Sequence, residues 1–547
     1  MKRSSLTELA NQSVDVLVIG GGVTGAATAR DAALRGLSVC LVEKGDFAGG
    51  TSSRSTKLIH GGLRYLEQFE FKLVREACHE RELMLRLAPH LSHPRPFIYL
   101  NYDGYPEGMF KLNVGLSIYD WFSGNPRKRR HHMLSAVELL REEPHLNPKG
   151  LHGGGWYYDS LTDDARLTID TLKAACDAGA KAANYMEVTG FVYRDGRIAG
   201  VKAADGLTGE QGEIRALQVI NATGVWSDEV RLLENPAADM RMRPAKGVHI
   251  VLSKEDFPLN HAVFLRAPRD RRVVWPIPSL DGDLVYVGTT DTDYRGPLDH
   301  VVATRDDVDY LLEVANHTIP GRNLTREHVV AAWAGLRPLV KPDANVSTSK
   351  TSREHQILLS KAGLLTIAGG KLTTSRVMGL QVVDAAVRIL GELFGRKGIP
   401  GSVSHQWPLS GGELQPDFQK QVGETTGRLH LSPTVAKRLS ERYGSNFFAI
   451  AGVISQDSSA AQAMGGHDVV AAEVRYAVQE EMARTLTDFM DRRSALLYWN
   501  KDGGADIATN VAAEMGRFLG WDPAEQQRQV SAYHDWVVAN RAFPTGD

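Results

Sequence analysis

The chain has 547 residues, of which 43% are hydrophobic and 23% are charged, with a formal net charge of −2 at pH 7. This length predicts two or three domains, and the balanced charge argues against a nucleic-acid partner. The sequence contains no apolar run of about 18 residues, so we expect no membrane-spanning helix. Its three cysteines form no C-x-x-C pattern and favour a reducing compartment.

The amino-terminal region predicts a dinucleotide-binding strand, turn and helix. In order, the chain presents an apolar run (14–19), a Gly-x-Gly-x-x-Gly turn (20–25), an alanine-rich helical stretch (26–35), a second apolar run (37–42) and Glu43. Side chains at Gly20 or Gly22 would block a pyrophosphate from the helix N-terminus, and Gly25 lets the helix lie close to the sheet. Glu43 stands near the position expected for a carboxylate that binds ribose hydroxyls.

A polar segment from Thr51 to Leu66 follows Glu43 directly. It contains hydroxyl side chains, a lysine, a histidine, two arginines and a Gly-Gly pair. After the second strand of such a fold, a loop of this composition can wrap the phosphates of a cofactor and reach its reactive ring. A solvated loop is the alternative interpretation.

Two later apolar segments also end in small residues. Residues 216–220 lead to Gly224, and residues 364–368 lead to Gly369 and Gly370 before a predicted helix over 375–393. Ligands of open α/β sheets bind at the carboxyl ends of the strands, so the three turns are expected to converge on one site. From about residue 400 the pattern becomes helical: Val474, Val478, Met482, Leu486 and Phe489 follow helical spacing.

Six ordered strings carry a resemblance to a known family. They are Gly20–Gly25, Thr51–Leu66, Lys246–His249, Gly288–Asp291, Gly335–Leu339 and Gly369–Thr374. Together they closely resemble the FAD-dependent glycerol-3-phosphate dehydrogenases over about residues 14–395, with looser agreement through the helical tail.

The resemblance implies an α/β fold with three parts and FAD as the cofactor. The parts are a discontinuous Rossmann-like FAD domain of the glutathione-reductase and D-amino-acid-oxidase type (14–80, 158–225 and 331–395), a β-rich substrate cap (81–157 and 226–330) and a helical C-terminal domain (400–547). Gly20, Gly22 and Gly25 would cradle the pyrophosphate and Glu43 would hold the adenosine ribose. The other implied cofactor contacts are Thr51, Ser52, Gly224, Gly370 and Thr373.

The implied reaction transfers a hydride from C2 of sn-glycerol 3-phosphate to flavin N5 and forms dihydroxyacetone phosphate. A phosphate dianion needs fixed positive charge, and the planar fork of arginine suits it. Because they stand in the family strings, the resemblance implies a catalytic set of His249, Arg337 and Lys371. Arg64, Tyr65 and Arg353 are the expected substrate-binding residues. Both His249 and His60 are candidate bases because free histidine has a pKa near neutrality. The sequence does not fix which of them is the base, and His60 is also compatible with shaping the loop before Gly61 and Gly62. No metal site is expected.

Membrane quinone is the electron acceptor that the resemblance implies. Oxidase relatives, which use oxygen, carry a long insertion before the Gly-Gly-Lys string, whereas only 29 residues (340–368) stand there in this chain. This length favours a dehydrogenase. An oxidase of the same substrate, a flavin-dependent amine or amino-acid oxidase, and a flavin-binding sensor without turnover are the alternatives.

Quinone is lipid-soluble, so peripheral contact with the inner, cytoplasmic face of the membrane is expected. The basic segment Asn125–His132 is compatible with contact to anionic lipid, with a solvated loop, or with steering of an anionic substrate. A homodimer is possible and nothing in the sequence specifies it.

Overall fold

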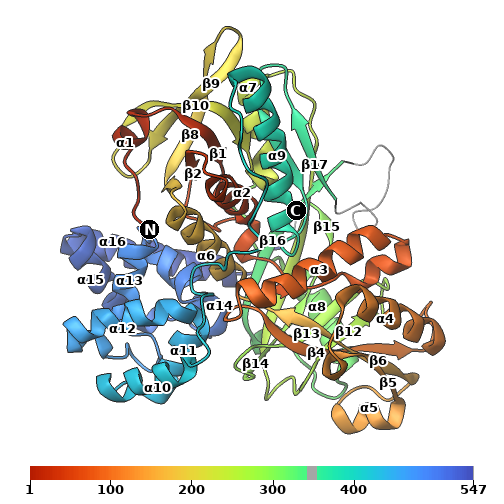
Figure 1. Cartoon of the computed structure of the whole chain (residues 1–547). Coiled ribbons are helices and arrows are strands. Elements are labelled where there is room, and N and C mark those ends of the chain that lie inside the picture. Colours follow the sequence, from red (N-terminus) through yellow and green to blue (C-terminus); the bar gives the residue numbers. More distant parts are fainter. Residues whose placement is uncertain (342–353, 546–547) are drawn as a thin grey trace.

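The computed structural model describes residues 1–341 and 354–545. It contains two β-sheets and a group of C-terminal helices, coloured blue in Figure 1. No helix in these two ranges combines the length and the apolar character needed to cross a membrane.

The first sheet has the strand order β17-β18-β10-β1-β2-β7. Its strands are β1 (Val14–Ile19), β2 (Val39–Val42), β7 (Lys181–Ala183), β10 (Gln211–Asn221), β17 (His355–Leu359) and β18 (Leu365–Gly369), and the hairpin β8 (Met186–Arg194) and β9 (Arg197–Asp205) extends β10. All neighbouring pairs along the main order are parallel except β17 with β18. Because β2 and β10 lie on opposite sides of β1, the carboxyl end of β1 is the switch point where a ligand is expected.

Alternation along β1 explains how the first sheet is covered. Val16 and Val18 pack against α2 (Val23–Leu34), α6 (Asp164–Asp177) and α9 (Ser375–Phe394). Leu17 and Ile19 point to the other face, toward α1 (Leu6–Ala10) and the β8–β9 hairpin, with α7 (Ser227–Glu234) nearby. Since β1 is buried on both faces, its sequence is an unbroken apolar run apart from Asp15.

The second sheet has ten strands. Along its main order they are β15 (Thr292–Asp293), β11 (Met242–Ser253), β14 (Leu284–Gly288), β13 (Val273–Pro278), β12 (Ala262–Arg266), β4 (His93–Tyr102), β6 (Leu151–Leu161) and β3 (Leu58–Ile59), with β16 (Val329–Val340) on β11 and β5 (His132–Ser135) on β6. Its helices are α3 (Phe71–Leu87), α4 (Met109–Ser123), α5 (Ala136–Glu142) and α8 (Arg305–Thr318). The domain ranges given above stay a prediction; β3 and β16 fall in the ranges of the predicted FAD domain and pair within this second sheet.

The C-terminal region is helical. Its helices are α10 (Phe418–Leu429), α11 (Pro433–Tyr443), α12 (Phe447–Gln456), α13 (Ala471–Glu480), α14 (Leu496–Trp499), α15 (Ala508–Leu519) and α16 (Pro523–Arg541), with a π-helical turn at Asp488–Arg493. The helical spacing over 474–489 does not correspond to one continuous helix, because α13 ends at Glu480 and Met482 has φ +55°. Buried Glu481 instead forms a 2.7 Å ion pair with Arg166 of α6.

Candidate active site

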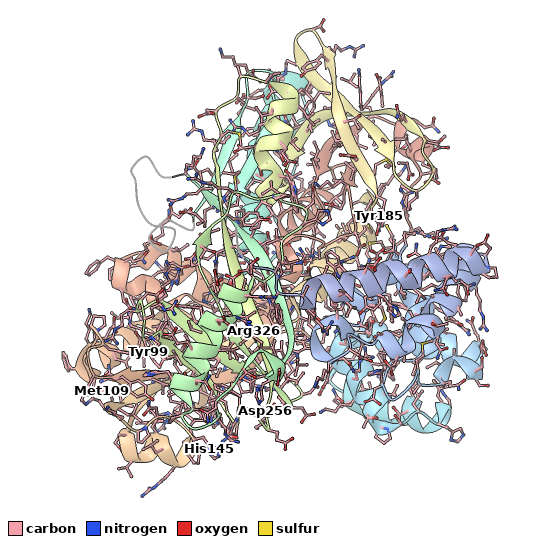
Figure 2. All side chains as sticks on the ribbon, turned by 180° about the vertical axis from the view of Figure 1, so that it is seen from behind. Tyr99, Met109, His145, Tyr185, Asp256 and Arg326 are labelled. Atoms are coloured by element: carbon pink, nitrogen blue, oxygen red, sulfur yellow. The ribbon has the colours of Figure 1, made fainter. Side chains whose placement is uncertain are left out.

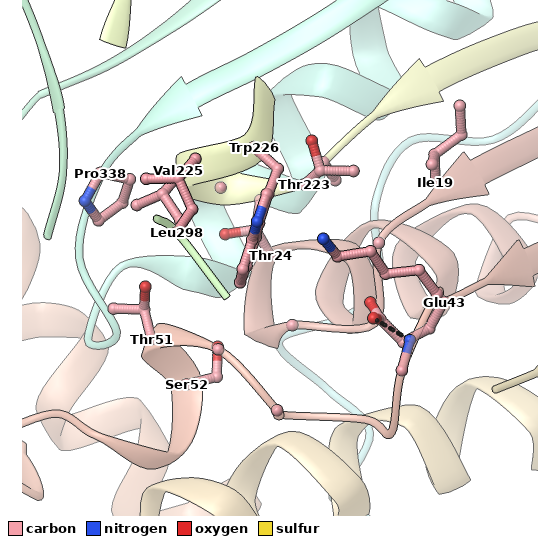
Figure 3. Close-up of a pocket in the computed structure, with 18 of the residues that line it drawn as sticks. Ile19, Thr24, Glu43, Thr51, Ser52, Thr223, Val225, Trp226, Leu298 and Pro338 are labelled. Carbon is pink, nitrogen blue, oxygen red and sulfur yellow. Dashed lines mark hydrogen bonds between the residues drawn. The ribbon is translucent and has the colours of Figure 1, made fainter. Parts of the chain in front are cut away.

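A cavity of about 870 Å³ lies at the carboxyl ends of β1, β10 and β18. Figure 3 shows part of its lining, with the side chains of Glu43, Thr51 and Ser52 around the turn that follows β1. The predicted cofactor residues that line it are Gly20, Gly22, Glu43, Thr51, Ser52, Gly224 and Gly370. The three strand-to-glycine turns therefore converge, as expected from the sequence.

The glycine turn is tight for measurable reasons. Gly20 has φ +110°, and a Cβ there would lie 2.7 Å from the carbonyl oxygen of Ala222. A Cβ on Gly25 would lie 1.9 Å from the carbonyl oxygen of Gly20, so Gly25 lets α2 begin directly against the turn. Gly22 is the N-cap of α2 and offers no side chain to cap it, so the positive end of this helix faces the turn at which an anion is expected.

The hydroxyl groups predicted to contact the cofactor, those of Thr51, Ser52 and Thr373, form hydrogen bonds within the protein. Ser52 Oγ accepts a 2.9 Å hydrogen bond from the Val23 N–H and so caps α2, whereas Thr51 Oγ1 donates a 2.7 Å hydrogen bond to the Leu336 carbonyl. The Thr373 hydroxyl accepts from the His60 N–H at 3.1 Å and donates to the His60 carbonyl at 3.2 Å. Thr373 thus joins the 371–374 segment to the polar loop, and its cofactor contact stays a prediction.

Glu43 is held by the backbone around the turn. Its carboxylate accepts hydrogen bonds from the N–H groups of Gly21 (2.6 Å) and Gly45 (2.9 Å). Burial raises the pKa of Glu43, while the two N–H groups oppose that rise. The carboxylate is therefore fixed beside the turn, at the place where the sequence predicts ribose binding.

Two tryptophans in the cavity wall were not predicted from the sequence. The indole Nε1 atoms of Trp226 and Trp536 are buried and have no hydrogen-bond partner among the described residues. Trp536 comes from α16 and stacks near Arg54, whose guanidinium carbon lies 5.5 Å from the indole centroid. A glycine turn that can receive phosphates, and two buried N–H donors that find no acceptor in the described part of the chain, fit a polar, extended ligand such as FAD.

Lys371 in the cavity wall belongs to a cluster of cationic side chains whose other members, Arg64 and Arg337, do not line the cavity. Lys371 lines it, and its Nζ lies 3.7 Å from the ring centroid of Tyr65. The Arg64 guanidinium is 5.0 Å from the same ring. Although burial opposes it, Tyr65 and Asp291 raise the pKa of Arg64 above its ordinary value. Arg337 Nη1 lies 3.2 Å from Asp291 Oδ1, and Asp291 also acts on Arg64, so these contacts connect Arg337, Arg64, Tyr65 and Lys371.

His249 lies in an aromatic and buried setting. Its ring stacks on Trp333 at 4.8 Å and covers Gly288, where a Cβ would lie 2.0 Å from His249 Cδ2. Nε2 is 3.1 Å from Thr56 Oγ1, and Nδ1 is buried without a hydrogen-bond partner among the described residues. Burial, helped by the charges of Arg337 and Lys57, lowers the pKa of His249 well below its ordinary value.

The expectation that the candidate bases have pKa values near neutrality is therefore wrong. Burial and the charges of Lys371 and Arg64 also lower the pKa of His60, to about 3. Both imidazoles are neutral at ordinary pH because their surroundings disfavour the charged form. Arg353, the remaining predicted substrate residue, lies outside the described residues.

The fold and this site define a dinucleotide-dependent oxidoreductase. The profile described as "FAD dependent oxidoreductase" matches residues 15–376, and "C-terminal domain of alpha-glycerophosphate oxidase" matches residues 402–526. The chain belongs to the FAD-dependent oxidoreductase family and, within it, to the aerobic glycerol-3-phosphate dehydrogenases. Its cofactor is FAD.

Three relatives support this assignment. The aerobic glycerol-3-phosphate dehydrogenase of Staphylococcus haemolyticus is 39% identical, with 95% of this chain and 93% of the relative covered. That of Bacillus subtilis is 38% identical, with 97% of each chain covered. The crystal structure of glycerol-3-phosphate dehydrogenase from Bacillus halodurans complexed with FAD has a TM-score of 0.81 at 32% identity, covering 99% of this chain and 98% of that one.

We expect Trp536→Ala to weaken FAD binding about tenfold, because it removes wall area and one buried N–H donor from the cavity. Titration of the apoprotein with FAD, followed by flavin fluorescence, measures the effect. Trp407→Ala is the matched control, since Trp407 is 55% exposed and does not line the cavity. Equal FAD affinity of both variants and the wild type would remove Trp536 from the cofactor site.

Proposed function

We propose that the protein oxidises sn-glycerol 3-phosphate to dihydroxyacetone phosphate and passes the electrons to membrane quinone. The observation that supports the substrate is the joined cluster of Arg64, Arg337 and Lys371, which reaches the cavity through Lys371. Fixed guanidinium and ammonium groups suit a phosphate dianion and the negative charge that develops at the C2 oxygen. When FAD is bound, it supplies the hydride acceptor.

We assign each predicted site residue a role in binding or catalysis from its position. We assign Arg337 and Arg64 to binding and orienting the phosphate end, with Tyr65 packed between Arg64 and Lys371. Lys371, the member of the cluster that lines the cavity, is assigned to the developing oxyanion. His249, a neutral imidazole whose buried Nδ1 has no hydrogen-bond partner among the described residues, is assigned as the base for the hydroxyl proton. Arg353 keeps its predicted role in substrate binding.

Transfer to quinone implies a peripheral position at the cytoplasmic face of the membrane. The full-length relatives are named dehydrogenases, which favours an acceptor other than oxygen. A homodimer stays part of the proposal only as the simplest assembly.

Anaerobic addition of glycerol 3-phosphate tests the proposal. The expected result is loss of the visible absorption band of oxidised flavin, followed by its return with a quinone and not with air. Bleaching that air reverses rapidly would identify an oxidase instead. If the flavin band persists with glycerol 3-phosphate but disappears with an amino acid or amine, the substrate is that compound and the assignment of glycerol 3-phosphate is wrong.

We expect His249→Gln to slow flavin reduction about 10²-fold, because the amide cannot accept the proton. The lowered pKa means that the wild-type imidazole is neutral and stays so on moderate acidification. The ratio of the two rates should therefore stay constant between about pH 8 and about pH 6. Stopped-flow reduction at several pH values measures it; an unchanged reduction rate would exclude His249 as the base.

A further inference from the structure

Helix α4 exposes an apolar face that the proposed reaction does not use. Phe110, Val114 and Trp121 are 82%, 43% and 77% exposed. At 3.6 residues per turn their positions lie on one side of the helix. Leu112, Leu116 and Tyr119 lie on the opposite side and are buried in the core. The helix therefore already has a packed face, and its second apolar face is turned outward.

The elements next to α4 add two more aromatic rings to the surface. Phe69 is 78% exposed and Phe71 is 41% exposed, and their rings contact each other at 6.2 Å. They stand where the short helix Leu63–Gln68 ends and α3 begins, and both of these helices contact α4. Figure 1 shows α3 and α4 together at the rim of the molecule, and Figure 2 shows Met109, the first residue of α4, at the same rim from behind.

Positive charge adjoins this face. Residues 109–130 contain five basic side chains and one acidic side chain, Asp120. Asp120 is engaged by His131, whose N–H and ring Nδ1 lie 2.8 and 2.7 Å from its Oδ2. Arg129 pairs with Glu82 at 3.0 Å. Lys111, Arg127, Lys128 and Arg130 are exposed and form no salt bridge within the described residues.

We propose that α4 and the basic segment 127–130 dock on the surface of an anionic lipid bilayer. Exposed phenylalanine and tryptophan beside unpaired lysine and arginine are the two signals that interfacial membrane binding requires. A second copy of the chain fits less well, because a symmetric contact through this face would bring two basic segments together. The inference rests on the proposed transfer to a membrane quinone and names the surface that serves it.

The proposed docking surface lies next to residues of the cationic cluster. Arg64 and Tyr65, which belong to the cationic cluster, lie on the short helix Leu63–Gln68, and Phe69 follows it directly. Docking through α4 and Phe69 would therefore hold one wall of the substrate end against the bilayer. A lipid-soluble acceptor could reach that wall without leaving the lipid.

Co-sedimentation of the holoprotein with phosphatidylcholine vesicles, with and without phosphatidylglycerol, tests the proposal. Wild type should bind the phosphatidylglycerol vesicles more tightly, and added salt should weaken the binding. Arg127→Gln/Lys128→Gln/Arg130→Gln should lose roughly 100-fold in affinity for these vesicles, at about fivefold for each charge. Phe110→Ser/Trp121→Ser should lose more than about tenfold on both vesicle types.

Matched controls separate docking from general surface effects. Trp407→Ser removes an exposed tryptophan elsewhere, and Lys420→Gln/Lys437→Gln/Arg517→Gln removes three side chains that are 75%, 70% and 68% exposed. Both should bind vesicles within about twofold of wild type. Retained FAD and an unchanged melting temperature verify folding of each variant. If a multiple variant fails to fold, tryptophan fluorescence provides the same test. Vesicles that contain brominated lipid should quench the fluorescence of the wild type, and should not quench that of Trp121→Phe.

The outcomes are decisive and independent of the reaction. The proposed docking surface is wrong if the wild type does not bind anionic vesicles, or if the α4 variants bind them as tightly as the wild type does. A wild-type dimer that the α4 variants convert to a monomer, with vesicle binding unchanged, would assign the face to subunit contact instead. Bleaching of the flavin by glycerol 3-phosphate in solution is measured on the same samples, so loss of docking and loss of the proposed activity are read separately.

Discussion

Gly25→Ala is expected to abolish tight FAD binding. The added Cβ would lie 1.9 Å from the Gly20 carbonyl oxygen and 3.5 Å from Val18 Cγ1, and the first of these is backbone that cannot rotate away. Relief of the clash must move the start of α2 or the turn, and the N–H groups that face the cavity move with it. We expect a loss of about 4 kcal/mol, or roughly 10³-fold in FAD affinity.

Gel filtration followed by the ratio of flavin to protein absorbance gives the first measurement, and reconstitution with FAD gives the affinity. Gly423→Ala is the control, because a Cβ there has no atom within 4 Å and the site is inside α10. This variant should retain FAD and gain about 0.4–1 kcal/mol of stability. Wild-type FAD affinity in Gly25→Ala would contradict the assignment of the turn to the cofactor.

The cofactor turn was predictable because its requirements are local. Strand, glycines, helix and acid follow one another within 30 residues or so, and each requirement leaves a residue type in the sequence. The convergence of three such turns was also predictable, since parallel strands bring their carboxyl ends to one edge. At Gly20 the sequence explains the glycine by the approach of a phosphate. The structure adds two further reasons: a φ of +110°, and the carbonyl oxygen of Ala222, which lies where a Cβ would need space.

The remaining features of the site depend on contacts between distant segments. Trp536 has the spacing of an ordinary helix residue, and only the packing of α16 beside Arg54 places it in the cavity wall. Likewise α13 ends at Glu480 although the apolar periodicity continues, and the next residue, buried Glu481, pairs with Arg166 of a helix in another part of the chain. The pKa of His249 depends on its burial on β11 between the neighbouring strands β14 and β16, which no local pattern specifies.

Arg337→Ala is expected to reduce kcat/KM for glycerol 3-phosphate by about 10³-fold. The guanidinium is held by Asp291 at 3.2 Å and by Thr289 Oγ1 at 2.9 Å, so its position is fixed before substrate binds. Gly247 makes room for it, since a Cβ there would lie 2.7 Å from Arg337 Nη2. Removal of a preorganised cation costs its attraction for the phosphate and leaves Asp291 to repel that phosphate.

Steady-state kinetics with a quinone acceptor measure this loss, and the retained flavin spectrum verifies that the cofactor site is intact. Arg337→Lys keeps the charge but not the fork, so it should recover part of the lost activity and no more. Arg243→Ala is the matched control: Arg243 lies on β11 and pairs with Asp293 at 2.7 Å in an exposed position, so its loss should change kcat/KM less than about twofold. If Arg337→Ala and Arg243→Ala have equal kinetics, Arg337 does not bind the phosphate, and Lys371 and Arg64 are the remaining ligands in the cluster.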